Sequence, residues 1–138
     1  MNVSKALLSF AVILLLALSS ALAQGPGAGT MRNYDPKTET RITGTIDDVQ
    51  QTTGRHGWMG VHLMLKTTSE VIEIHVGPAH YIEQQNFSFA KGDTIEVLGS
   101  RVKLGDQDAV IAREITKNGK TLTLRNAQGV PQWSGAAR

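Results

Sequence analysis

Three of the four histidines in the chain fall in one central stretch, where they could take part in metal binding. His62 and His75 lie in two short segments with alternating apolar and polar residues, 61–66 and 71–76. His56 precedes them in a glycine-rich stretch, 52–60. Neutral imidazole is a common ligand of first-row transition metals. The chemistry therefore depends on whether the fold brings these side chains together.

The two alternating segments predict a β-hairpin, with residues 67–70 as its connection. One face of each strand must be buried, so the register has to bring apolar side chains opposite apolar side chains. That requirement gives these pairs: Leu65 with Ile72, Leu63 with Ile74, and Val61 with Val76. The same register places His62 opposite His75 on the other face.

Directly opposed strand residues have Cβ atoms about 4.5–5.5 Å apart, which is close enough for two imidazoles to share one metal ion. Met64 and Glu73 also oppose each other on this face and could supply a third ligand. Methionine together with imidazole would favour copper over calcium or magnesium. The competing interpretation is an ordinary exposed strand face that carries scattered polar side chains.

The segments around the hairpin predict an all-β fold with one short helix. Further strands are predicted at 41–49, 94–98, 109–115 and 121–124, and a short helix at 79–86. The order β-β-β-α-β-β fits a five-stranded OB-fold barrel in which the helix covers one end, with a small additional C-terminal strand. The turn at Asn118-Gly119 would bring Ile115 opposite Leu122. A β-sandwich is the competing architecture, but it usually needs about seven strands.

Two segments carry a family resemblance. Residues 42–46 (ITGTI) open the fold and residues 91–99 (KGDTIEVLG) lead its fourth strand. Over residues 40–116 the chain resembles the bacterial exported OB-fold proteins of the stress-tolerance type, which are often labelled DNA-binding. The resemblance implies an exported OB barrel.

OB barrels generally bind their ligands on the outer face of the second and third strands, beside the loop that joins the first two. The residues that we expect to bind a ligand there are Arg55, His56, Trp58, Met64, Lys66 and Glu73, with His62 and His75 as metal ligands. The occupant would be a small ligand or a metal ion. The alternative is a module that docks an envelope protein. Trp58 could instead cover the barrel mouth, and His80 is expected to pack at the barrel end.

Nucleic acid is an unlikely partner, because the basic residues are interleaved with acidic ones and form no dense patch. The strands of the predicted binding face also offer no aromatic side chain on which bases could stack. An enzyme is not expected, because recognisable catalytic motifs such as Gly-x-Ser-x-Gly and His-Glu-x-x-His do not occur. The chain has no cysteine, which excludes disulfides and thiolate metal sites.

The first residues predict export. Lys5 is followed by an apolar run at 7–22 that ends in Ala-Leu-Ala, which is typical of a signal peptide at 1–23. A retained membrane anchor is less favoured, because serines shorten the apolar core below the roughly 20 residues that span a bilayer. We therefore expect a periplasmic protein. Its parts would be a flexible leader at 24–38, one OB domain at 39–126 and a tail at 127–138 that either covers the barrel or stays loose.

Overall fold

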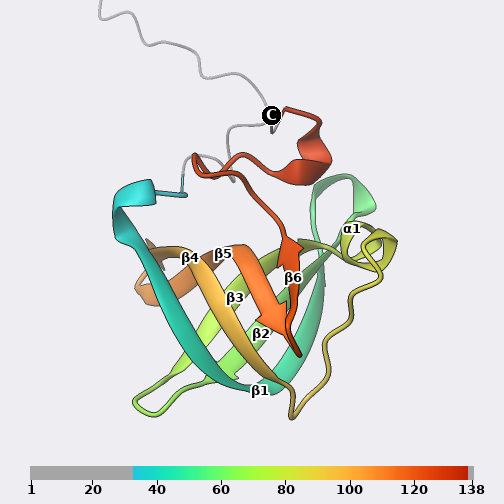
Figure 1. Cartoon of the computed structure of the whole chain (residues 1–138). Coiled ribbons are helices and arrows are strands. Elements are labelled where there is room, and N and C mark those ends of the chain that lie inside the picture. Colours follow the sequence, from blue (N-terminus) through green and yellow to red (C-terminus); the bar gives the residue numbers. More distant parts are fainter. Residues whose placement is uncertain (1–32, 137–138) are drawn as a thin grey trace, which may run out of the picture.

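Six strands, one short helix and three single-turn 3₁₀ helices make up the fold of residues 33–136, the part of the chain that the computed structural model describes (Figure 1). The strands and the helix follow one another in this order: β1 (Glu39–Thr53), β2 (Met59–Lys66), β3 (Val71–Pro78), α1 (Ala79–Gln84), β4 (Thr94–Leu104), β5 (Gln107–Lys117) and β6 (Lys120–Thr123). The strands at both sides of the helix are longer than predicted. The predicted signal peptide and most of the predicted leader lie outside the described residues.

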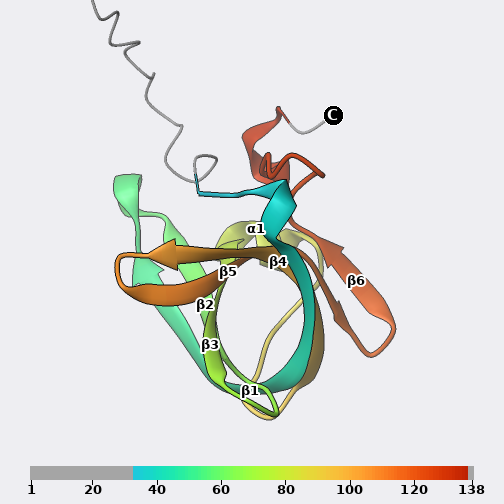
Figure 2. The same ribbon diagram turned by 90° about the vertical axis from the view of Figure 1, so that its left-hand side faces the viewer.

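The sheet closes on itself. Its strand order is β3-β2-β1-β4-β5-β6, and a parallel pairing of β3 with β5 joins the first five strands into a ring. Figure 2 shows this ring, with β6 bonded to β5 outside it. The predicted OB-type architecture of five barrel strands, one short helix after the third strand and an additional C-terminal strand is confirmed. The predicted pairing of Ile115 with Leu122 is confirmed as well.

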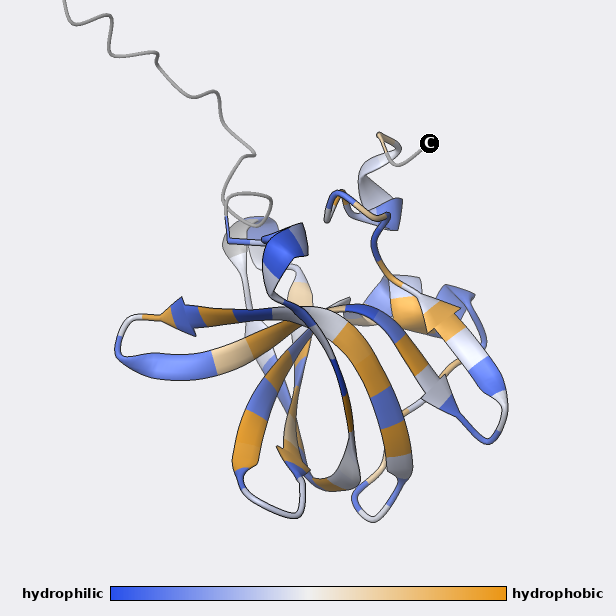
Figure 3. Cartoon of the chain, turned by 60° about the vertical axis from the view of Figure 1, so that its left-hand side comes forward, coloured by the Kyte–Doolittle hydropathy of each residue, from blue (hydrophilic) through white to orange (hydrophobic). Residues whose placement is uncertain are grey.

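Alternation along the strands fills the barrel with apolar side chains, as the hydropathy colouring in Figure 3 illustrates. Leu63, Leu65, Ile74, Val97 and Ile115 are all fully buried in one core. The polar residues between them face outward. This inward packing fixes which side chains β2 and β3 present on their outer face.

β1 takes part in two pairings, which lets the sheet curl. Its first half pairs with β4 and its second half with β2, and Gly44 lies close to the point where it passes from one to the other. A Cβ atom on Gly44 would lie 2.5 Å from the carbonyl oxygen of Lys66. Only glycine permits this close backbone approach.

The register of the β2–β3 hairpin is confirmed for Leu65–Ile72, Leu63–Ile74 and His62–His75, and is wrong at one pair. Val61 pairs with Gly77 instead of Val76, because a bulge between Val61 and His62 leaves one extra residue on β3. Val76 nevertheless remains fully buried. The bulge therefore shifts the end of the hairpin without disturbing the two histidines.

The two ends of the described chain pack against the barrel. The structure differs from the expected flexible leader at residues 34–38, where Tyr34 is buried and Pro36–Thr38 form a 3₁₀ turn. The C-terminal tail folds back, so that Trp133 packs against Tyr81 and Gly77. Within residues 33–136, no helix has the length and apolar character needed to cross a bilayer.

Candidate metal site

The outer face of β2 and β3 brings together His62, Glu73 and His75. His62 comes from β2 and lies directly opposite His75 on β3, and Met64 lies opposite Glu73 on the neighbouring rung. All three side chains of the cluster are partly exposed, with relative exposures of 21% for His62, 31% for Glu73 and 28% for His75. They are therefore held by the sheet yet open to an ion from solution.

A single carboxylate oxygen joins the two imidazoles. Nδ1 of His62 lies 2.7 Å from Oε1 of Glu73, and Nε2 of His75 lies 3.0 Å from the same oxygen. Nδ1 of His62 donates a hydrogen bond to this oxygen, and Nε2 of His75 makes a second close contact with it. The ring centroids are 4.2 Å apart. One donor atom from each of the three residues thus converges on one small region, with all three atoms within 4.8 Å of one another.

This spacing suits a metal ion. Ligand atoms about 2.0–2.1 Å from a transition metal, at coordination angles between the octahedral and tetrahedral values, lie about 3.0–3.4 Å from one another. The two distances from Glu73 Oε1 are already close to that range. An ion bound there would take the place of the imidazole protons and draw the three donor atoms, which lie within 4.8 Å of one another, into this range.

Electrostatics favour the neutral, metal-binding form of His75. Burial lowers the pKa of His75, and the neighbouring His62 ring lowers it further, whereas Glu73 acts in the opposite direction. A neutral imidazole carries the lone pair that a metal needs. With neutral rings, the Glu73 carboxylate gives the cluster a negative charge that attracts a cation.

Thr52 extends the cluster toward β1, a contribution that sequence reasoning missed. Its hydroxyl lies 3.4 Å from Nε2 of His62, the ring nitrogen that faces away from Glu73. Histidine ligands usually donate their second N–H to an oxygen, which fixes the tautomer and the ring orientation. The sequence carries no direct signal for this contact, because Thr52 lies beyond the predicted strand 41–49 and a bulge between Ile46 and Asp48 shifts the alternation of β1 before Thr52 pairs with Gly60.

Met64 and Lys66, which were also predicted at this site, lie at two positions along β2. Met64 opposes Glu73 as expected. The cluster of His62, Glu73 and His75 itself offers two imidazole nitrogens and one carboxylate oxygen. That set is harder than the methionine and imidazole pair on which the copper preference depended. Lys66 lies at the far end of β2, where it lines a shallow cleft with Thr67 and Lys91.

The β1–β2 loop carries the remaining predicted residues and lies beyond the cluster. Its 3₁₀ turn spans Arg55–Gly57, and His56 is exposed there. Trp58 is half exposed and stands edge-on against the ring of His80, with centroids 4.8 Å apart. The loop and the β4–β5 hairpin project on the same side of the barrel (Figure 2). The loop is joined to the cluster face through the start of β2. His80, which was expected to pack at the barrel end, is exposed on α1 and contacts Trp58.

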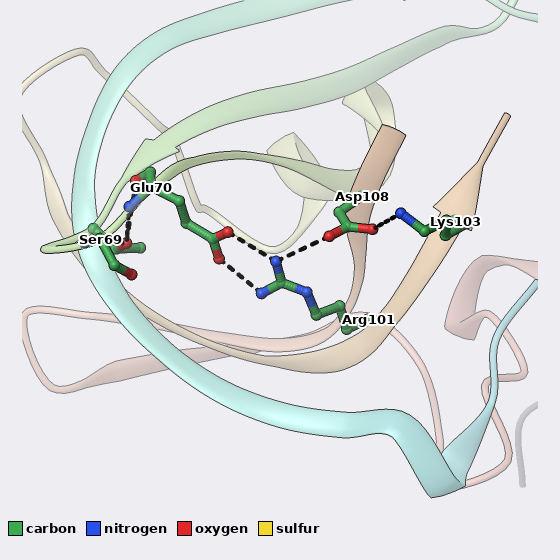
Figure 4. A network of polar contacts seen from close by, with 6 residues as sticks. Ser69, Glu70, Arg101, Lys103 and Asp108 are labelled. Carbon is green, nitrogen blue, oxygen red and sulfur yellow. Dashed lines mark hydrogen bonds and ion pairs between the residues drawn. The ribbon is translucent and has the colours of Figure 1, made fainter. Parts of the chain in front are cut away.

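A second polar network lies near the cluster and contains no histidine (Figure 4). Arg101 donates to both carboxylate oxygens of Glu70, at 2.7 and 2.8 Å, and also to Asp108 at 3.3 Å. Lys103 binds Asp108 from the other side. The network connects the β2–β3 turn with the β4–β5 hairpin. The sequence did not predict the pair of Glu70 with Arg101, because the two residues are separated by 31 positions.

Residues 38–122 match the sequence profile of the MamS/MamX magnetosome protein family. The match covers more than half of the 138-residue chain and runs from the start of β1 into β6. It names a different family from the exported stress-tolerance proteins that the sequence resembles. A comparison with curated proteins gives no match.

Proposed function

The chain belongs to the MamS/MamX magnetosome protein family, and from this premise we propose that it is an exported, non-enzymatic protein that binds a divalent transition-metal ion on the outer face of β2 and β3. The observation that carries the proposal is the convergence of His62 Nδ1, Glu73 Oε1 and His75 Nε2. Export through residues 1–23 to the periplasm is part of the proposal. The association of the family with the magnetosome supports a role outside the cytoplasm.

The donor set indicates the class of ion. Calcium and magnesium prefer sites made of oxygen ligands, and copper(I) prefers sulfur. Two imidazole nitrogens with one carboxylate oxygen suit divalent ions of the first transition series. Among cobalt, nickel, copper and zinc, we expect copper(II) to bind most tightly in solution, following the general order of affinity for these ions.

A binding role agrees with the exposure of the site. The three side chains are open enough for an ion to exchange with solvent, and each is held on a rigid strand. Such a site can take up and release an ion without rearranging the barrel. We therefore propose an accessory role, in which the protein holds or delivers a metal ion.

Titration calorimetry of the protein with zinc, nickel, cobalt and copper(II) tests this function. We expect one ion per chain for the wild type. Loss of a residue that merely supports a metal ligand typically costs about 10–100-fold in affinity, so replacing both imidazole ligands should cost more than about 100-fold. The variant His62→Ala/His75→Ala should therefore lose the site, whereas the control His80→Ala should bind like the wild type. Wild-type affinity in the double variant would contradict the proposal.

Docking of a protein partner is a second candidate function. Trp58 and Met59 are exposed, with relative exposures of 50% and 38%, and both lie at the β1–β2 loop beside the cluster. Large exposed apolar side chains that lie together often mark interaction surfaces. A chain that binds none of the four ions would leave this candidate ahead.

A further inference from the structure

Three protein ligands leave the coordination of a transition metal incomplete. Closed structural sites use four protein ligands, whereas sites with three keep a position for water or another donor. His62, Glu73 and His75 all come from one hairpin, and all are partly exposed on its outer face. The remaining coordination position of a bound ion therefore faces away from the barrel, where a donor from outside the chain can reach it.

Gly60 lies next to His62 on this face and has no internal reason to be glycine. A Cβ atom there would meet nothing closer than 3.7 Å, whereas one on Gly44 would lie 2.5 Å from a backbone carbonyl. The backbone of Gly60 is also outside the left-handed region that favours glycine. Glycine within a strand weakens the strand, and it often marks the close approach of another backbone. The clearance at Gly60 thus points to something that approaches from outside.

The β1–β2 loop presents a donor that the chain does not use at its own cluster. His56 is exposed at the tip of the loop, and its backbone is left-handed, with φ 63° and ψ 21°, which is uncommon for a residue other than glycine. The exposed side chains of Trp58 and Met59 follow it directly. The loop therefore combines a metal-binding imidazole with apolar contact surface.

His56 of the loop does not belong to the group of donor atoms that converge in its own chain. Gly60 and His62 occupy alternate positions along one side of β2, Trp58 directly precedes the strand, and at about 3.3 Å per residue the extended distance from residue 58 to residue 62 is about 13 Å. His56 lies farther still from the cluster along the chain. Gly60 is midway between Trp58 and His62. A twofold axis near Gly60 would therefore place the loop of each copy over the cluster of the other.

We propose that metal binding joins two copies of this chain face to face, with His56 of each copy completing the coordination of the ion held by His62, Glu73 and His75 of the other. This inference rests on the proposed metal-binding function. Stable interfaces usually bury more than about 1,000 Å², and two exposed apolar side chains per copy fall short of that area. The metal-free chain is therefore a monomer, and the dimer depends on the ion.

Sedimentation velocity with and without zinc tests the dimer. The wild type should double its mass at one zinc ion per chain and return to a monomer when the ion is chelated. Gly60→Val should still bind one ion, and His56→Ala should bind one ion more weakly; both should be at least as stable to heat as the wild type, yet remain monomers. Thr121→Val, on the exposed strand β6, is the control and should dimerise. A wild-type chain that binds zinc without a change in mass would overturn the dimer and leave the proposed function intact.

A mixing experiment identifies the shared donor. His56→Ala keeps the cluster but lacks the loop imidazole, and His62→Ala/His75→Ala keeps the loop but lacks the cluster. Each variant alone should stay monomeric in zinc, whereas an equimolar mixture should form a heterodimer with one ion per pair. A mixture that remains monomeric would refute the exchange of loops. A wild type that binds no zinc would refute the proposed function together with the dimer.

Discussion

Two glutamates three positions apart, Glu70 and Glu73, hold their partners in different ways. Glu70 receives two hydrogen bonds from the guanidinium of Arg101, one on each oxygen. Glu73 receives two contacts on a single oxygen, from the imidazoles of His62 and His75. Guanidinium does not lose its proton in proteins, whereas imidazole is neutral or charged near neutral pH.

The difference shows which carboxylate can bind a metal. An ion can displace the protons of two imidazoles and use their lone pairs, but it gains no ligand by displacing a guanidinium. Glu70 is thus occupied by a partner that joins the β2–β3 turn to the β4–β5 hairpin. Glu73 is held by partners that become ligands with it. We therefore propose that similar ion-pair geometry serves the barrel at one position and a metal site at the other.

Exchanging either glutamate for glutamine should separate the two roles, and this is the largest effect that we expect. Glu73→Gln removes a charged ligand, so zinc affinity should fall by more than about 100-fold, beyond the typical cost of losing a supporting residue. Glu70→Gln should leave zinc affinity unchanged and lower the melting temperature by a few degrees. Calorimetry measures the zinc affinity of each variant, and thermal unfolding measures its melting temperature. Equal losses of affinity in the two variants would contradict the assignment of separate roles.

Acid should weaken the metal-free protein in two steps. The pKa of His75 is lower in the folded chain than in the unfolded chain. As the pH drops below about 6.5, the ordinary imidazole pKa, the unfolded chain therefore takes up a proton before the folded chain does, and the free energy of unfolding falls. Arg101 lowers the pKa of Glu70, so its stabilising effect is present above the ordinary carboxyl pKa and is lost below about pH 4.

Urea unfolding between pH 8 and pH 3 measures these steps. His75→Ala should remove most of the first step and leave the second, and Glu70→Gln should reduce the second and leave the first. A profile in which neither variant changes its assigned step would show that the two regions do not titrate separately.

The sequence was sufficient to predict the facing histidines, because the period of a strand determines which side chains share a face. The same reasoning failed at Val61, since a bulge keeps Val76 inside while shifting its partner by one residue. That Glu73 would receive contacts from both rings depends on side-chain rotamers, which alternation does not specify. The sequence therefore indicated which face carries the site, but not that one oxygen of Glu73 contacts both imidazoles.

Contacts between distant segments were beyond the sequence for a different reason. The pair of Arg101 with Glu70 forms only because β3 lies next to β5 when the barrel closes. Nothing local in either segment encodes that parallel pairing. From the sequence, the tail at 127–138 could either cover the barrel or stay loose. It folds back because Trp133 finds an aromatic and glycine surface at Tyr81 and Gly77.

Thr52→Val should lower zinc affinity by less than Glu73→Gln does, and it tests whether Thr52 supports the ring of His62. The substitution removes the hydroxyl 3.4 Å from His62 Nε2 and keeps the shape of the side chain. Loss of such a supporting partner costs about 10–100-fold, and the long contact suggests about tenfold. Calorimetry with zinc measures the loss, with Thr121→Val on the exposed strand β6 as the control. An unchanged affinity would mean that Thr52 does not orient the ring.

Lys103→Ala should have the smallest effect and serves as a baseline for the Glu70 region. Its ammonium group binds Asp108, but the side chain is 70% exposed. Exposed ion pairs contribute little to stability because solvent screens them. Thermal unfolding should show no measurable change, and zinc binding should be unaffected. A clear drop in melting temperature would show that the whole network, rather than the Arg101–Glu70 pair alone, stabilises the closure of the barrel between β3 and β5.

The most direct test of the metal site is a two-dimensional ¹H–¹⁵N spectrum of the histidine rings, recorded with and without zinc. The structure predicts that zinc shifts the Nδ1 resonance of His62 and the Nε2 resonance of His75 to the positions of metal-bound nitrogens, and that the proton of His62 then lies on Nε2, beside Thr52. Binding through the opposite nitrogen of either ring, or no change at both rings, would contradict the site.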